Sequence, residues 1–310
     1  MTTVRIPAGW PATEEQARAV QDELRNRVVL DEDGPEPGTG HVTGVDVAYD
    51  DERDVVVAAA VVLDAATLDV VAEATAVGQV SFPYVPGLLA FREIPTVLAA
   101  LDALPCAPGL VVCDGYGLAH PRRFGLASHL GVLSGHPTIG VAKNPFTFTY
   151  DDPGPARGSA APLLGPVSEV APAGRRLARP LAAPGESPST SGPSTGSSAR
   201  HAESTLPHAR TRARAGAPPS PPPGPPFGRT TPLPAQALAG TEEVGRALRT
   251  RDGVKPVFVS VGHRVSLDTA CAHTLALTPE YRIPESTRRA DSLCRRALKE
   301  ATVPGGGRGV

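Results

Sequence analysis

Several features that would assign this 310-residue chain to a common class of protein are missing. Its four cysteines form no CxxC pair, so nothing supports a zinc ribbon or a redox dithiol. The longest apolar runs, such as Val55–Leu63, are far shorter than the roughly 20 residues that a membrane-spanning helix needs. Residues 1–10 contain no apolar signal-peptide core. We therefore expect a cytoplasmic protein with reduced cysteines and no membrane partner.

Neither positive nor negative charge predominates, because the formal net charge is only −2. This value argues against a strongly basic coat protein for nucleic acid. The charge is unevenly distributed, however. Residues 166–238 contain eight arginines, three glutamates and no lysine, a net charge of +5, so the rest of the chain carries −7. An acidic body that binds nucleic acid needs a local basic groove or bound metal ions.

Proline is in excess, with 35 in the chain, and 16 of them lie between residues 166 and 238. A segment of this composition cannot bury enough apolar surface to offset the entropy that it would lose on folding. The other residues have the composition of an ordinary globular domain. We predict one domain formed by residues 1–164 and 240–303, a disordered insertion at 165–239 and a flexible tail at 304–310.

Valine-rich runs and amphipathic stretches predict the elements of this domain. Thr13–Gln16 forms a capping box that opens a helix ending near Val29. The expected strands are His41–Tyr49, Val55–Leu63, Asp69–Val77, Gly109–Cys113, Thr138–Ala142 and Val257–Val261. The other expected helices are Leu88–Leu104, Leu126–Leu133, Thr241–Arg251, Leu267–Leu277 and Arg288–Ala301. An antiparallel meander followed by alternating helices and strands predicts an α/β fold, a mixed β-sheet flanked by helices.

Acidic residues occur at positions where sites form. Asp46 lies inside a strand, where aspartate is depleted, and Asp114 directly follows a buried strand. Glu93 lies on the preceding helix, and Asp268 lies on the first turn of a later one. Carboxylates that converge from different elements would make an all-oxygen site for Mg²⁺ or Mn²⁺, suited to phosphodiester hydrolysis. Taken singly, each acid is more often a turn, cap or solvated helix residue.

Three other side chains are candidates for contact with a substrate. Lys143 ends a strand and could neutralise a phosphate, although a surface lysine is the commoner reading. His263 follows a strand and could donate to a phosphate, ligate a metal or move a proton, although a lone histidine is more often structural. Tyr84, between two prolines, could enter a base stack as a wedge or simply pack within its loop.

Several segments read together resemble the endonuclease V family. They are Gly44–Tyr49, Pro83–Gly87, Phe91–Glu93, Asp114–Arg123, Phe124–Gly131, Gly140–Lys143 and Val259–Arg264. Their order and spacing fit the family over about residues 10–165 and 239–300. The insertion departs from the family pattern. It is a passive linker, a basic contributor to nucleic-acid affinity or a sequence artefact.

The resemblance implies an RNase H-like fold and a Mg²⁺-dependent endonuclease that recognises hypoxanthine, the base of deoxyinosine, in DNA. The enzyme would hydrolyse the second phosphodiester bond 3′ to the lesion during DNA repair, leaving 3′-hydroxyl and 5′-phosphate ends. The implied metal ligands are Asp46, Glu93, Asp114 and Asp268, with Mn²⁺ able to substitute, and Lys143 and His263 join the catalytic group. The implied substrate-binding residues are Tyr84, Gly87, Gly115, His120, Arg122, Gly125, Leu126 and Gly140.

Alternative functions stay open at this point. They are an inosine-specific endoribonuclease, a different RNase H-like nuclease and a catalytically inactive binder of damaged nucleic acid. The presence of Asp46, Glu93 and Asp114 argues against an inactive binder, and the Tyr84 loop favours recognition of a base over that of a junction. DNA and RNA differ in how the 2′-hydroxyl is seated, which a sequence does not give. We expect a monomer whose partner is deoxyinosine-containing DNA.

Overall fold

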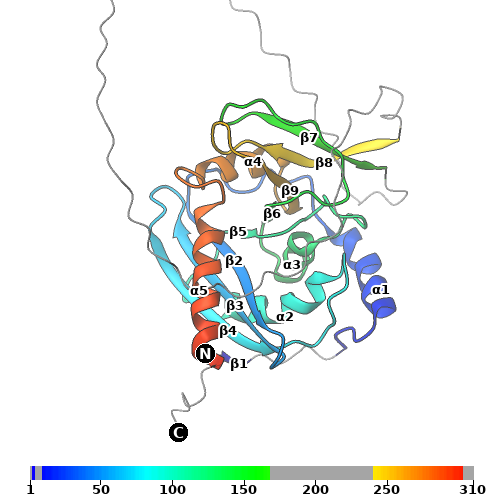
Figure 1. The fold of residues 1–310 in the computed structure, drawn as a ribbon, viewed down its shortest axis with the longest axis vertical. Coiled ribbons are helices and arrows are strands. Elements are labelled where there is room, and N and C mark those ends of the chain that lie inside the picture. Colours follow the sequence, from blue (N-terminus) through cyan, green and yellow to red (C-terminus); the bar gives the residue numbers. More distant parts are fainter. Residues whose placement is uncertain (1, 4–8, 168–239, 303–310) are drawn as a thin grey trace, which may run out of the picture. The chain divides into compact units, whose positions relative to one another are not determined.

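The computed structural model describes residues 2–3, 9–167 and 240–302, which belong to one compact unit. A mixed sheet runs through this unit, with helices on both of its faces (Figure 1). The fold class expected from the sequence is therefore confirmed. The predicted insertion lies outside the described residues from residue 168 onward, and so does the predicted tail at residues 304–310.

Nine strands and five α-helices are present in the described residues. The strands are β1 (Thr2–Thr3), β2 (His41–Asp50), β3 (Val55–Asp64), β4 (Val70–Gln79), β5 (Leu110–Cys113), β6 (Thr138–Ala142), β7 (Ala160–Pro166), β8 (Thr241–Leu248) and β9 (Val257–His263). The helices are α1 (Glu14–Leu24), α2 (Leu89–Asp102), α3 (Leu126–Ser134), α4 (Leu267–Ala276) and α5 (Glu285–Thr302). Across the sheet the strands lie in the order β1-β4-β3-β2-β5-β6-β9-β8-β7.

Strand direction decides which ends of the strands meet. β2, β3 and β4 form the predicted antiparallel meander, whereas β2, β5 and β6 run parallel to one another. β9, β8 and β7 are again antiparallel to their neighbours. The carboxyl ends of β5 and β6 therefore lie at the same end of the sheet, the position where open sheets form their sites.

Apolar side chains on both faces of the sheet form the core. Alternate residues of β3 point to opposite faces, and eight of its ten residues are buried. On one face Ala59 and Val61 pack against Leu293 of α5. On the other face Ala58 and Ala60 belong to a cluster with residues of α2 and α3. Because helices cover both faces, a central strand reads as a continuous apolar run, as β3 does.

Helix α1 begins as the sequence predicts. The hydroxyl of Thr13 accepts a hydrogen bond from Gln16 N, and Gln16 Oε1 accepts one from Thr13 N, so the capping box is complete. The helix ends at Leu24, earlier than expected, because the chain tightens into a 3₁₀ turn over residues 25–27. The buried residues of α1 are Ala17, Gln21 and Leu24.

The helix predicted over residues 241–251 is wrong, because this segment contains strand β8. Glu242 and Glu243 indicated the acidic first turn of a helix, but residues of this strand pair with β7 and β9. Strand β7 was not predicted, since its seven residues include two prolines and one glycine, which are depleted in strands. Pairing between distant parts of the chain determines the structure of both segments.

Strands β7 and β8 bring Val167 and Gly240 together. Pro166 pairs with Thr241, and Val167 N donates a hydrogen bond to Gly240 O at 2.8 Å. The first part of the domain therefore continues to residue 167, beyond the predicted boundary at residue 164. The two described ends that flank residues 168–239 are neighbours in one ladder.

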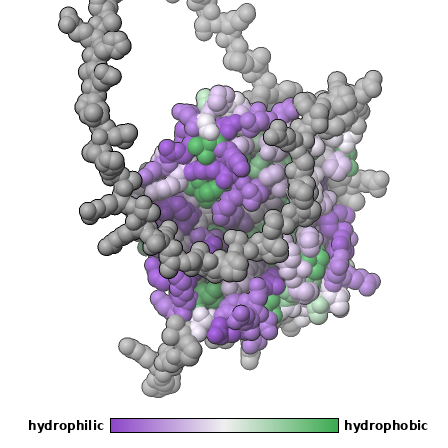
Figure 2. Space-filling model, viewed as in Figure 1, coloured by the Kyte–Doolittle hydropathy of each residue, from purple (hydrophilic) through white to green (hydrophobic). Residues whose placement is uncertain are grey.

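None of the five described helices is long and apolar enough to cross a bilayer. The face of the molecule seen in Figure 2 is mostly hydrophilic, and its apolar residues form small, separate spots. Tyr84 is the most exposed of the large apolar side chains in the described residues, with 69% of its surface accessible. A binding partner can contact a tyrosine that is exposed to this extent.

Candidate active site

Three carboxylates meet beside the carboxyl end of β5. Asp46 lies on β2 and Asp114 directly follows β5, and the residues before them, Val45 and Cys113, are register partners in parallel strands. Glu93 reaches the two aspartates from α2, and all three residues line one small cavity. The structure thus brings together three of the residues that the sequence analysis singled out.

Burial and like charge disfavour the ionised forms of Asp46 and Glu93. The pKa of Asp46 is raised to about 7, first by burial and then by the charge of Asp114. The pKa of Glu93, a residue that is only 6% exposed, is raised to about 8, again mainly by burial. Tyr49 Oη donates to Glu93 Oε1 at 2.9 Å and opposes this shift. A cation placed among these groups would lower both pKa values.

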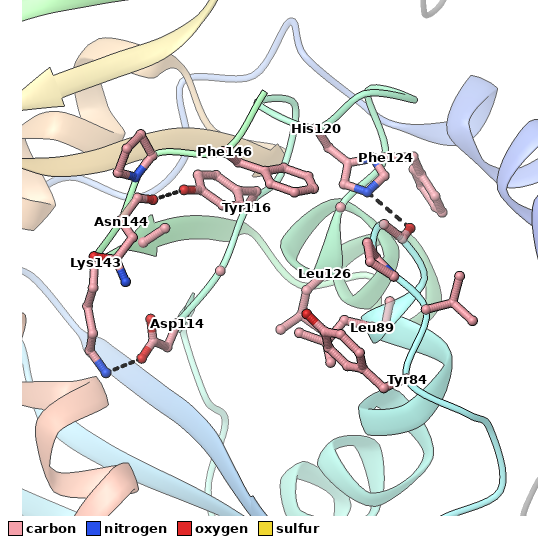
Figure 3. A pocket seen from close by; sticks show the side chains of 18 residues that line it. Tyr84, Leu89, Asp114, Tyr116, His120, Phe124, Leu126, Lys143, Asn144 and Phe146 are labelled. Carbon is pink, nitrogen blue, oxygen red and sulfur yellow. Dashed lines mark hydrogen bonds and ion pairs between the residues drawn. The ribbon is translucent and has the colours of Figure 1, made fainter. Parts of the chain in front are cut away.

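Lys143 is a cation that the chain itself places here. It directly follows β6, and its Nζ forms an ion pair with Asp114 Oδ2 (Figure 3). Burial alone would lower the pKa of Lys143, but the charges of Asp114 and Asp46 outweigh burial and the pKa is raised. Arg282 Nη2 donates to Lys143 O at 2.6 Å and holds this part of the backbone. A protonated amine is thus fixed beside the carboxylates.

The carboxylates suit a hard divalent cation by their chemistry. Mg²⁺ and Mn²⁺ prefer oxygen ligands, and Asp46 and Glu93 are carboxylates whose ionised forms are disfavoured mainly by burial and would be favoured by a nearby cation. In their present positions, no three His, Cys, Asp or Glu side chains of the described residues are arranged to hold an ion. Asp114 is paired with Lys143 and Glu93 with Tyr49, so these side chains would exchange partners on binding an ion.

One carboxylate that acts on this cluster was not predicted from the sequence. Asp291 on α5 acts on both Asp46 and Lys143, raising the pKa of each, so it lies within electrostatic reach of the site. Arginines surround it on the helix, with Arg288 and Arg289 before it and Arg295 and Arg296 after it. A signal was present in the sequence, because Asp291 is the single acidic residue between Glu285 and Glu300.

His263 lies at the opposite end of the sheet. Since β9 is antiparallel to β6, its last residue pairs with Thr138, the first residue of β6. His263 is therefore separated from Lys143 by five residues of strand, or roughly 16 Å at about 3.3 Å per residue. Its Nδ1 accepts a hydrogen bond from Val29 N at 3.1 Å, and burial lowers its pKa. The expectation that it completes the acidic site is not met by this geometry.

Two other candidate residues are engaged in ion pairs elsewhere. Asp268, with 82% of its side chain exposed, pairs with Arg246 of β8. Arg122 pairs with Asp22 at 2.5 Å and donates to Arg18 O, both on α1. These ion pairs hold Asp268 and Arg122 away from the three carboxylates. Neither residue lines the carboxylate cavity or the larger pocket described next.

A pocket of about 460 Å³ opens beside Asp114 and Lys143. Figure 3 shows these two residues on one side of the opening, and Tyr84 and Leu126 on the other. The volume lies within the range of about 300–1,000 Å³ that is usual for ligand sites. The predicted substrate-binding residues that line the pocket are Tyr84, Gly87, Gly115, His120, Gly125 and Leu126.

Glycines allow segments of backbone to meet at the pocket. Gly140 lies on β6 behind the lining, and a Cβ on it would be 2.5 Å from Gly115 O and 2.9 Å from Gly117 N. A Cβ on Gly125 would be 2.4 Å from Tyr116 O. A side chain at either position would displace the pocket backbone. Gly140 therefore supports the pocket and does not line it.

His120 holds the end of the Tyr84 loop. Its pKa is lowered to about 4 by burial, so the imidazole is neutral at pH 7. Nδ1 accepts a hydrogen bond from Arg122 N at 3.2 Å, and Nε2 faces Gly87 O at 3.1 Å. Only a donor pairs with a carbonyl, so these two contacts assign the proton to Nε2. The imidazole thereby fixes Gly87 from one side.

Helix α3 carries a histidine whose ring lies next to three aromatic rings. His129 is fully buried, and its ring lies 6.0 Å from that of Trp10, 4.9 Å from Phe91 and 5.0 Å from Phe124. Neither ring nitrogen has a hydrogen-bond partner in the part of the chain that the structure describes. Burial lowers the pKa of His129 to about 3. The neutral form of the imidazole is therefore favoured in the folded state at pH 7.

We expect His129 to destabilise the protein in mild acid. Its pKa in the folded state lies below the unfolded value of about 6.5, so the unfolded state binds more protons between these two pH values. The free energy of unfolding then falls as the pH falls through this window, by roughly 2 kcal/mol at pH 5. In His129→Phe, the loss of stability between pH 7.5 and pH 5, measured by urea denaturation, should be smaller by about this amount. Equal losses in both proteins would contradict the expectation.

Known proteins that are similar to this chain are endonucleases. The Endonuclease V family model matches residues 22–182 and 224–292. The chain is 68% identical to an endonuclease V of Streptomyces avermitilis, over 98% of this chain and 100% of that protein. A crystal structure of Streptomyces avermitilis endonuclease V superposes with a TM-score of 0.71 at 66% identity, over 97% of this chain and 100% of that chain. The structure of Ciona intestinalis endonuclease V in complex with a 24mer DNA containing an inosine followed by a ribo-adenosine shares the fold, with a TM-score of 0.59, 22% identity and coverage of 93% and 98%.

The fold, the acidic cluster and these relatives together define an endonuclease. The family model matches more than half of the chain, and the Streptomyces avermitilis relative aligns with 98% of it. The chain belongs to the endonuclease V family. The family that the sequence segments indicated is thus confirmed.

Proposed function

We propose that this endonuclease recognises deoxyinosine in DNA and hydrolyses the second phosphodiester bond 3′ to it, leaving 3′-hydroxyl and 5′-phosphate ends. The observation that carries the proposal is a pocket that opens directly beside Asp114 and Lys143. A place for an extruded base then adjoins a place for phosphate chemistry. The inosine in the DNA bound to the Ciona relative supports this class of substrate. Repair of deaminated adenine is the process that such a cut would serve.

In this proposal, different residues of the pocket have different roles in recognising the substrate. Tyr84, exposed on its proline-flanked loop, inserts into the base stack at the lesion. The extruded base enters the pocket that this loop and Leu126 line, where the bare backbone of Gly87 and Gly115 can approach its edge. Lys143 carries a positive charge at the same pocket and neutralises a phosphate of the bound strand.

The residues that would hold Mg²⁺, or Mn²⁺ in its place, are Asp46, Glu93 and Asp114. Asp291 replaces Asp268 as the fourth carboxylate of the cluster in this proposal, because it acts on Asp46. When bound, the ion supplies Lewis-acid stabilisation of charge on the phosphate and activation of water. A bound cation would also offset the burial and the like charge that raise the pKa values of Asp46 and Glu93.

Inosine-containing RNA is the second candidate substrate. The specific observation that favours it is the ribo-adenosine that follows the inosine in the DNA bound to the Ciona relative. Discrimination between the two substrates depends on how the 2′-hydroxyl is seated next to the pocket. The inactive binder is disfavoured, because a protein that only binds would not need Asp46, Glu93 and Asp114 together.

The proposal is tested by incubating an end-labelled duplex that contains one deoxyinosine with the protein, in Mg²⁺ or in EDTA. We expect a single nick one nucleotide beyond the lesion, and only in Mg²⁺. The same duplex with deoxyadenosine at that position is the control and should stay intact. An intact deoxyinosine duplex alongside cleaved single-stranded inosine RNA would move the substrate to RNA. Tight binding without cleavage of either would support the inactive binder.

A further inference from the structure

The pocket proposed for the base has two walls that come from distant parts of the chain. One wall is the loop from Tyr84 to Gly87, and the other is the segment from Phe124 to Leu126. Tyr84, Phe124 and Leu126 lie across the opening from Asp114 and Lys143 (Figure 3), so the relative position of these two segments shapes that side of the pocket. A group that is bonded to both walls would therefore set the fit of the pocket.

Gln21 of α1 is bonded to both walls. Its Nε2 donates to Gly87 O at 3.0 Å and to Phe124 O at 3.4 Å. The side chain is only 1% exposed and lies behind the pocket lining. Because both acceptors are carbonyl oxygens, the contacts fix which end of the amide is the nitrogen.

The choice of glutamine at this position is not explained by packing alone. Gln21 Oε1 is buried and has no hydrogen-bond partner among the described residues, which is unfavourable for stability. An apolar side chain of similar size would fill the same space beside Ala17 and Leu24 without this defect. The donor that faces the two walls accounts for the glutamine. His120 Nε2 adds a second donor to Gly87 O, so this carbonyl is held twice.

We propose that Gln21 is a positioning residue that sets the shape of one side of the base pocket, and thereby the preference of the protein for deoxyinosine over undamaged DNA. It acts through the carbonyls of Gly87 and Phe124 and does not touch the base. The inference rests on the proposed function, because the extruded base is the ligand whose fit is being set.

The test measures the affinity of the wild type, Gln21→Met and Gln21→Glu for two labelled duplexes in Ca²⁺. One duplex contains deoxyinosine, and the other contains deoxyadenosine at the same position. Gln21→Met keeps the length of the side chain and removes the donor, whereas Gln21→Glu turns a second acceptor toward the two carbonyls. We expect affinity for the deoxyinosine duplex to fall about tenfold in Gln21→Met, or about 1.4 kcal/mol, and further in Gln21→Glu. Affinity for the undamaged duplex should not change, because that duplex does not enter the pocket.

Gln16→Glu is the matched control. It makes the same change on the same helix, at an exposed capping-box position where glutamine and glutamate both serve. Both affinities should equal those of the wild type. Thermal melting establishes that each variant is folded before its affinities are compared, and either variant of Gln21 suffices for the comparison.

The outcomes separate the inference from the function on which it rests. A wild-type ratio of the two affinities in the Gln21 variants overturns the inference and leaves the proposed function intact. An equal loss for both duplexes also overturns it, because that pattern describes a general structural role. A wild type without any preference for deoxyinosine overturns the proposed function and the inference together.

Discussion

Replacing Asp46 by asparagine should slow the cleavage of a deoxyinosine duplex by at least about 10³-fold, measured in single turnover at saturating Mg²⁺. The substitution removes one negative charge from the centre of the cluster, where Asp114, Lys143 and Asp291 all act on Asp46. A loss of this size corresponds to about 4 kcal/mol of transition-state stabilisation, within the several kcal/mol that a metal ion contributes at such sites.

The same substitution should stabilise the metal-free fold. Burial and the charge of Asp114 raise the pKa of Asp46 to about 7, so the ionised carboxylate is unfavourable in the folded state. An asparagine oxygen can still accept the hydrogen bond of 2.8 Å from Val47 N. We expect the free energy of unfolding in EDTA at pH 8 to rise on the order of 2 kcal/mol, measured by urea denaturation. A variant that loses both activity and stability would point to damage of the fold.

Asp268 and Asp291 provide a matched pair of controls for the site. Asp291 acts on Asp46, whereas Asp268 is exposed and paired with Arg246. Asp291→Asn should therefore lower the cleavage rate strongly, and Asp268→Asn should leave it within about twofold of the wild type, as surface substitutions usually do. The opposite result would refute the assignment of Asp291 and restore the residue that the sequence alone suggested.

The second large effect is expected at Gly140. A Cβ at this position would lie 2.5 Å from Gly115 O, which belongs to backbone and cannot rotate away. Gly140→Ala should therefore destabilise the protein by about 3 kcal/mol, the upper part of the usual range for overpacking, and should displace the pocket backbone. We expect a lower midpoint in urea and weaker cleavage of the deoxyinosine duplex.

Gly115→Ala is the comparison that isolates the steric cause. The nearest atom to a Cβ there is Leu126 Cδ2 at 3.5 Å, an ordinary contact, so the loss of stability should be below about 1 kcal/mol. Similar losses of stability in Gly140→Ala and Gly115→Ala would mean that the close approach behind the pocket is relieved by movement of the backbone.

The elements that were predicted well are those marked by local signals. Helix α3 was expected from Leu126 to Leu133 and runs from Leu126 to Ser134, where Gly135 in the left-handed region ends it. The β2–β4 meander was predicted because short valine-rich strands are separated by acidic turns. Asp46 and Asp114 were also found from a local signal. Each is a charged residue that lies within or directly after an apolar strand.

The elements and residues that were missed depend on pairing across long stretches of chain. β7 and β8 lie on either side of residues 168–239, so neither strand is recognisable without its partner. The family resemblance placed His263 in the catalytic group, but the direction of β9 puts it at the end of the strands away from Lys143. Asp291 was hidden among arginines, and only the packing of α5 against β2 and β3 brings it near Asp46.

The hydrogen bond of 2.8 Å from Val167 N to Gly240 O closes a ladder between the two described residues that flank residues 168–239. A site whose two ends are already adjacent accepts sequences of very different length, because the body does not have to stretch to accommodate them. This junction is therefore a place where a fluorescent protein or an affinity module could be spliced into the chain. Such a chimera would combine the nuclease with a reporter inserted inside the chain, and both termini would stay unmodified.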